Sequence, residues 1–74
     1  MSVILKYLEN VYKIYRHNYE IELKKLQHIP IMTNTWITQR NKVEHLNTKC
    51  NFISELIEIR KTYLNCLKYI KDRS

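Results

Sequence analysis

The chain has 74 residues, so one small domain is the upper limit. It contains no Gly and only one Pro, which argues against a β-rich fold, because tight turns between strands usually need glycine. The 13 Lys and Arg exceed the 7 Asp and Glu, and the net charge of +6 predicts an acidic partner: a protein, a nucleic acid or an anionic lipid.

Residues 3–28 are predicted to form one long amphipathic helix, capped by Ser2. Apolar residues recur along one arc of this helix, with charged residues opposite. The arc contains Ile4, Leu8, Val11, Tyr15, Tyr19 and Leu26, with Leu5, Tyr12 and Leu23 at its edge. A second stripe along one flank comprises Val3, Tyr7, Ile14 and Ile21. The apolar surface is therefore wider than a single neighbour needs.

A loop around Pro30 should separate this helix from the next, because proline disfavours helix at Ile29. Cap residues follow the loop in the run 33–35, and a weakly amphipathic helix is predicted over 36–47. The candidates for a new cap, Asn47, Thr48 and Asn51, then predict a short break.

Residues 51–72 are predicted to form the most apolar helix, with two stripes that cover about half its circumference. One stripe contains Phe52, Leu56, Ile59, Tyr63, Cys66 and Ile70, and the other Ile53, Ile57, Leu64 and Leu67. A helix this apolar should contact two neighbours. We therefore expect an all-α fold, a small antiparallel three-helix bundle with helices at about 3–28, 36–47 and 51–72, in a single domain over 1–74.

Cys50 and Cys66 cannot form a disulfide if they share one helix, because their Cα atoms would then be roughly 24 Å apart. We expect both as reduced thiols in the core. No stretch approaches the roughly 20 apolar residues of a membrane span, and the N-terminus lacks the pattern of a secretory signal. We therefore expect an intracellular protein without a membrane span.

Catalysis is not indicated. His17, His28 and His45 share no spacing with one another, with Cys or with a carboxylate that would build a metal site or a catalytic dyad. A glycine-rich phosphate loop is impossible without glycine. We expect neither an enzyme nor a metal protein.

Arg60 projects from the middle of the broad apolar face of the last predicted helix. Either its stem packs while its guanidinium reaches water, or the face is a groove in which Arg60 meets an anionic group. The tyrosines at 12, 15 and 19 are explained most simply as core, with base stacking as the alternative. Trp36, with Arg40 and Lys42, is either a lid over the core or a recognition patch.

Three segments carry a resemblance to a known family: VYKIYR in the first predicted helix, WITQRNKVEHLN in the middle, and ELIEIRKTYLNCLKYI at the end. In this order they resemble the LYR-motif proteins of mitochondria, small basic three-helix adaptors whose first helix carries Leu-Tyr-Arg. Here Ile14 stands in the position of the Leu, before Tyr15 and Arg16. The family's downstream Phe is absent, and Leu46 is the nearest candidate.

The resemblance implies a non-catalytic adaptor in the mitochondrial matrix or on the matrix face of the inner membrane, as an accessory subunit or assembly factor of a larger complex. Family members bind the acidic acyl carrier protein, whose acyl-phosphopantetheine enters between the three helices; the chain would need no cofactor of its own. The implied partner-binding residues are Ile14, Tyr15, Arg16, Arg40, Lys42 and Arg60. The implied acyl-chain or core groove consists of Leu8, Tyr12, Tyr19, Leu46, Leu56, Ile57 and Leu64.

Two other functions stay open. A self-associating helical protein, for example a viral one, would inhibit a host protein through its apolar face. It is indicated by the coiled-coil spacing of Trp36, Val43, Cys50, Ile57 and Leu64. A small nucleic-acid-binding helical module is less favoured, because the basic residues are spread along the chain and form no stripe.

Overall fold

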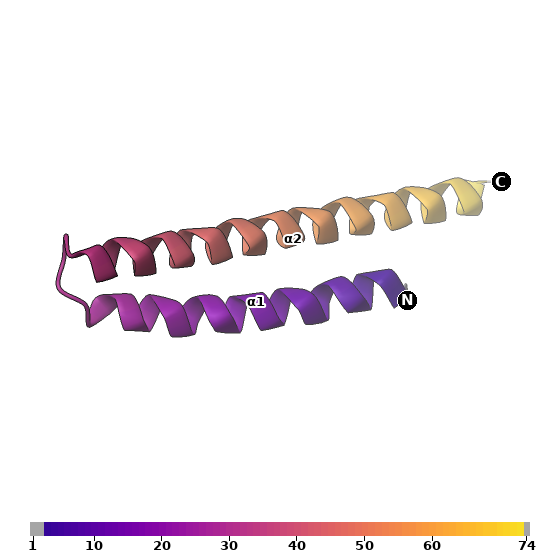
Figure 1. The fold of residues 1–74 in the computed structure, drawn as a ribbon. Helices are drawn as coiled ribbons and strands as arrows, with labels where there is room; N and C mark the ends of the chain where they lie inside the picture. Colours follow the sequence, from indigo (N-terminus) through magenta and orange to yellow (C-terminus); the bar gives the residue numbers. More distant parts are fainter. Residues whose placement is uncertain (1–2, 74) are drawn as a thin grey trace.

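The protein is an elongated helical hairpin. The structure, a computed structural model, describes residues 3–73 and contains two helices, α1 (Val3–Gln27) and α2 (Asn34–Arg73). They lie antiparallel and side by side, joined by a short loop at one end (Figure 1). The hairpin measures 62 × 16 × 13 Å. The predicted cap at Ser2 falls outside the described residues.

The all-helical class is confirmed, but the predicted three-helix bundle is wrong. The segments predicted as separate helices, 36–47 and 51–72, belong to one continuous helix of 40 residues. No residue between positions 47 and 51 forces the helix to break, because neither Gly nor Pro is present there. Thr48 does not cap a new helix: its hydroxyl donates to the Glu44 carbonyl at 3.0 Å within α2. Cys50 and Ile53 are both buried, so packing against α1 continues through the same segment.

The loop turns the chain without glycine. α1 ends at Gln27, before Pro30, as predicted. Met32, in the loop that reverses the chain direction, adopts a left-handed conformation with φ of 70°. Thr33 caps α2: its Oγ1 accepts the Trp36 N–H at 3.1 Å and donates to the Pro30 carbonyl at 2.8 Å. The predicted cap before Trp36 is therefore confirmed.

The core is a single seam between the two helices. Leu5, Ile53 and Ile57 are its buried centre, and half-buried residues pack against them: Leu8, Val11, Tyr12, Tyr15 and Leu64. The α2 stripe that contains Ile53 and Ile57 packs against α1, whereas in the other predicted stripe Leu56 is half-buried and the remaining residues are exposed. On α1 the seam is centred nearer Leu5 than expected, because Leu5 is buried while Ile4 is exposed.

The last turns of α2 project beyond α1. With 40 residues against 25, α2 is much the longer helix, and its C-terminal end extends past the N-terminal end of α1 (Figure 1). This segment has no helical neighbour in the hairpin. The expectation that the apolar last helix contacts two neighbours at once is therefore wrong for this structure, in which α2 contacts α1 alone.

We expect Ile57→Ala to destabilise the hairpin by about 2–4 kcal/mol, because it removes buried methyl and methylene groups from the seam. Ile59→Ala is the matched control: the same residue type two positions away is exposed, and its truncation should change stability by less than about 0.5 kcal/mol. Urea unfolding followed by circular dichroism measures both. Equal effects of the two variants would mean that Ile57 is not in the seam.

Candidate interaction surface

A polar cluster joins the two helices at the loop end of the hairpin. The Glu22 side chain is buried, and its carboxylate accepts a hydrogen bond from Gln39 Nε2 at 2.6 Å. The same Nε2 group also donates to the Glu22 backbone carbonyl at 2.9 Å. Lys42 and Lys25 complete the cluster, with Nζ atoms 3.3 Å and 3.4 Å from Glu22 Oε1. Every contact of this carboxylate is thus made within the hairpin.

These contacts lower the pKa of Glu22 below its ordinary value of 4.5. The hydrogen bond from Gln39 is the largest cause, and hydrogen bonds from Lys42 and Lys25 act in the same direction. Burial opposes them, because removing water from a carboxylate disfavours its charged form. The hydrogen bonds outweigh the effect of burial, so the net pKa is lowered. The ionised form of Glu22 therefore stabilises the folded hairpin.

Two shallow apolar grooves lie between α1 and α2, one in the middle of the hairpin and one near the end opposite the loop. The outer groove has a volume of about 430 Å³ and is lined by Ile4, Leu8, Leu56, Ile59, Arg60 and Tyr63. The middle groove, of about 410 Å³, is lined by Val11, Tyr15, Thr48, Lys49, Phe52 and Ile53. Leu8 and Val11 are three residues apart on α1, and Phe52 and Leu56 four apart on α2. Residues so spaced lie on one helix face, so both grooves open on the same side, which we call the open side.

The open side carries large apolar groups without cover. Phe52, Ile59 and Tyr63 have exposed fractions of 61%, 65% and 52%. All three belong to the second predicted α2 stripe, of which only Leu56 is half-buried. Monomeric proteins expose scattered apolar residues, but a row at helical spacing beside two grooves is typical of a binding surface.

Each groove also holds one cation over a tyrosine ring. Lys49 Nζ lies 5.3 Å from the centre of the Tyr15 ring, and the Arg60 guanidinium carbon lies 5.4 Å from that of Tyr63. No Asp or Glu lines either groove. Among the described residues, neither cation forms an ion pair, and the Nε of Arg60 is buried without a hydrogen-bond partner. The groove cations thus have unused capacity for an anion.

The structure distributes the partner-binding residues expected from the sequence over separate places. Ile14 is exposed, Tyr15 packs on the core and lines the middle groove, and Arg16 pairs with Glu20 at 3.4 Å. Arg40 pairs with Glu44 at 3.1 Å and lies over the Trp36 ring, whereas Lys42 belongs to the Glu22 cluster. Arg40 and Arg60 are 20 residues apart on α2, about 30 Å along its axis, so these cations do not form one patch.

The residues expected to form an acyl-chain or core groove divide into two groups. Ile57 is buried in the seam, and Tyr12 and Leu64 pack against it. Leu8 and Leu56 line the outer groove, whereas Tyr19 and Leu46 are half-buried and line neither groove. A closed space between three helices does not exist here, because the hairpin has only two.

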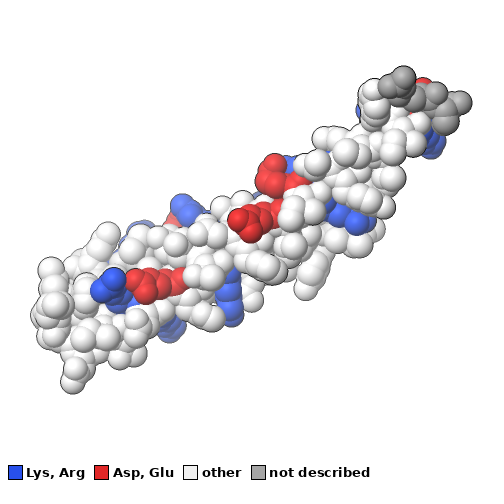
Figure 2. Space-filling model, turned by 90° about the horizontal axis from the view of Figure 1, so that it is seen from above, with Lys and Arg blue, Asp and Glu red and all other residues white. Residues whose placement is uncertain are grey.

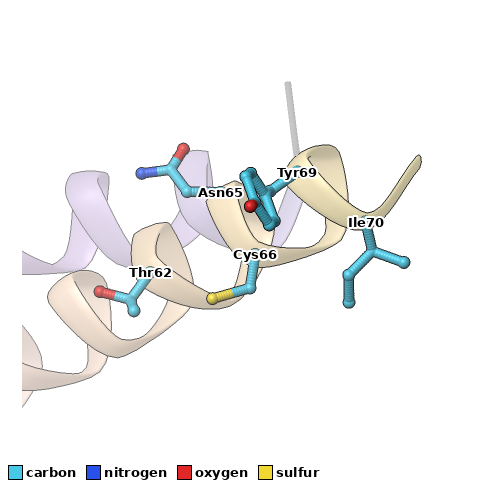
Figure 3. Close-up of a pocket in the computed structure, with 5 residues that line it drawn as sticks. All are labelled: Thr62, Asn65, Cys66, Tyr69 and Ile70. Atoms are coloured by element: carbon cyan, nitrogen blue, oxygen red, sulfur yellow. The ribbon is translucent and has the colours of Figure 1, made fainter. Parts of the chain in front are cut away.

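The projecting end of α2 has a surface of its own. Figure 3 shows a shallow depression lined by Thr62, Asn65, Cys66, Tyr69 and Ile70, all from α2. Cys66 is exposed, so the expectation of a core thiol is wrong for this residue. It holds for Cys50, which is buried and whose pKa is raised by burial, with Arg16 acting in the opposite direction. Neither cysteine is in a disulfide, as predicted.

Charge does not gather into one basic region on the surface above α2. In that view acidic and basic side chains are interspersed, with wide uncharged areas between them (Figure 2). Neither described helix is apolar enough over a sufficient length to cross a membrane. Within residues 3–73, no three His, Cys, Asp or Glu side chains come together as a metal site. No family model, no curated protein and no solved structure matches the sequence.

Sequence reasoning missed Lys49 and the Glu22–Gln39 pair. Gln39 was visible among apolar neighbours on the inner face of its helix, and Glu22 lies seven residues after Tyr15, on the same arc. Two polar residues on facing apolar arcs of an antiparallel pair are a signal for a cross-helix hydrogen bond. Lys49 was missed because the predicted break placed it outside both helices.

We expect the hairpin to lose stability below about pH 4.5, as Glu22 is protonated. Because its folded-state pKa is depressed, the contribution of Glu22 is complete above its ordinary value of 4.5 and is lost as the pH falls through the folded value. Glu22→Gln should therefore lower the unfolding temperature at pH 7, and its difference from wild type should shrink towards pH 3.

The matched control is Glu20→Gln, which removes a carboxylate that is exposed and paired only with Arg16 on the same helix. Thermal unfolding between pH 3 and pH 7 compares the two. A constant difference between Glu22→Gln and wild type over this range would contradict a depressed pKa at Glu22.

Proposed function

We propose that this chain is a non-catalytic adaptor that binds an acidic protein through the open side of the hairpin. The observation that carries the proposal is the pair of apolar grooves, each with a cation and without an acid. The net charge of +6 favours an acidic partner over a neutral or basic one. An apolar centre bordered by charge is the usual composition of a protein-binding surface.

An acyl carrier protein, as the LYR-motif resemblance implies, is the candidate partner, and a larger mitochondrial complex is the assembly onto which the pair would dock. A carrier is acidic, and its acyl chain is apolar, which suits the grooves. The acyl chain cannot enter between three helices here, because the hairpin has two. We propose that it lies along the outer groove against Leu8 and Leu56, with Arg60 near its anionic phosphopantetheine arm.

We expect Ile59→Asp to weaken binding of an acyl-loaded mitochondrial carrier protein at least tenfold, because it places an acid in the outer groove. Ile37→Asp is the matched control: it is the same change at another exposed isoleucine of α2, and Ile37 lines neither groove. Isothermal titration calorimetry measures both, and circular dichroism checks that each variant stays helical. Failure of the wild-type chain to bind either the loaded or the unloaded carrier would reject this candidate.

Self-association is the second candidate, and a separate stripe favours it. Val3, Tyr7, Ile14 and Ile21 are all exposed on α1, and the last three recur every seven residues. Two hairpins that paired along this stripe would form a four-helix bundle. Ile57, which belongs to the coiled-coil repeat in the sequence, is buried inside one hairpin, so its substitution does not test this candidate.

If the chain acts through self-association, sedimentation equilibrium of the wild type should give the molar mass of a dimer. The Ile14→Asp variant should give that of a monomer. The control is Ile31→Asp, at an exposed isoleucine in the loop, which should leave the dimer intact. A monomer at concentrations of tens of micromolar would exclude this candidate and leave the adaptor proposal in place.

A further inference from the structure

The two groove cations have a fixed separation on one helix. Lys49 and Arg60 are 11 residues apart on α2, which is continuous between them, so they are about 16 Å apart along its axis. Eleven residues are close to three whole turns, so both side chains leave α2 in nearly the same direction. Both face the open side, because each lines one of the two grooves there.

Each cation is also restrained in place. A tyrosine ring of the same groove lies under it, Tyr15 under Lys49 and Tyr63 under Arg60. Each residue also lines one of the grooves, and both are only partly exposed. A cation held in this way loses less freedom on pairing with an anion than one on a free surface chain.

The exposed apolar row on α2 lies beside the same two cations. Phe52 is three residues after Lys49. Ile59 directly precedes Arg60, and Tyr63 follows it by about one turn. The members of this row are spaced i, i+7 and i+11 along α2. A second helix laid along the open side would contact the row with apolar residues of its own at i, i+3, i+4 and i+7. On α2 the two grooves run from Thr48 to Tyr63, about 22 Å along the helix axis, which matches the length of a partner helix of roughly 15 residues.

From this arrangement we propose that the open side binds one amphipathic helix of an acidic partner that carries two carboxylates 11 residues apart, one for Lys49 and one for Arg60. The inference rests on the proposed adaptor function and names the element of the partner that is recognised. The partner helix lies along α2 over the two grooves. Its apolar face covers Phe52, Ile59 and Tyr63.

A second copy of this chain fits the open side less well. The chain does contain acids 11 residues apart, Glu9 with Glu20 and Glu44 with Glu55. However, Glu20 is already paired with Arg16 and Glu44 with Arg40. Lys13 also lies four residues after Glu9 on the same helix face, so it would be presented to the groove cations of the other copy together with that acid.

The probe for the test is a designed, fluorescently labelled amphipathic peptide with leucines on one face and two glutamates 11 residues apart beside them. The control peptide has the same composition, with the glutamates nine residues apart, which places them on opposite faces of the helix. We expect the full-length protein to bind the first peptide at least fivefold more tightly in fluorescence anisotropy. The difference should shrink in 0.5 M salt, because salt screens exposed charge pairs.

The double variant Lys49→Glu, Arg60→Glu should lose its preference for this peptide and prefer one in which lysines replace the two glutamates. Lys24→Glu, Lys68→Glu is the control with the same charge change, since neither residue lines a groove. Circular dichroism checks folding, and Lys49→Gln, Arg60→Lys is a milder pair that should only reduce the preference for the 11-residue spacing.

Three results would overturn the inference. They are equal affinity for both glutamate peptides, no measurable binding of either, and a wild-type dimer whose formation excludes the peptide. Under any of them, loss of carrier binding in Ile59→Asp would still support the adaptor proposal. Conversely, spacing-dependent peptide binding without carrier binding would keep the helix site and reject the carrier as the partner.

Discussion

A hairpin of two helices has one interhelical seam, and the rest of this structure depends on that limit. A helix can bury against one neighbour only a stripe of about 100°, whereas apolar residues cover about half the circumference of the C-terminal part of α2. Ile53 and Ile57 therefore enter the seam, and Phe52, Ile59 and Tyr63 stay outside it. The exposed row is a geometric consequence of having no third helix, and it leaves a surface for which the hairpin itself provides no cover.

The fold class could be predicted from the sequence, but the number of helices could not. Absence of glycine, the Pro30 loop and the Thr33 cap are local features, and each acts as its chemistry predicts. The supposed break depended on Asn47, Thr48 and Asn51, whose side chains suit a cap or a helix surface equally. Packing decided between the two, because Cys50 and Ile53 continue the buried stripe on both sides of that segment.

The same error concealed half of the candidate site. Arg60 stands out in the sequence because the residues three and four positions before and after it are all apolar. Lys49 has no such setting as long as a break separates it from Phe52. Once α2 is continuous, Lys49 and Arg60 acquire a common direction and a fixed distance, and that relation exists only in the folded helix. Similarly, Glu22 looks like an ordinary charged residue until the antiparallel register brings Gln39 to it.

The two ends of the hairpin use charge in opposite ways. At the loop end, Glu22 has its partners within the chain. The cluster opposes sliding of one helix along the other, since a shift of one turn would remove the contacts of the buried carboxylate with Gln39 and Lys42 and leave it only Lys25 on its own helix. Register fixed at that end also determines which α1 residues lie opposite Lys49 in the middle of the hairpin and Arg60 near its other end, and hence the shape of both grooves. Stability and binding are thus separated along the hairpin's length. The internal ion cluster aligns the helices, and the groove cations, which have tyrosine rings but no acid as internal partners, remain available to an anionic group.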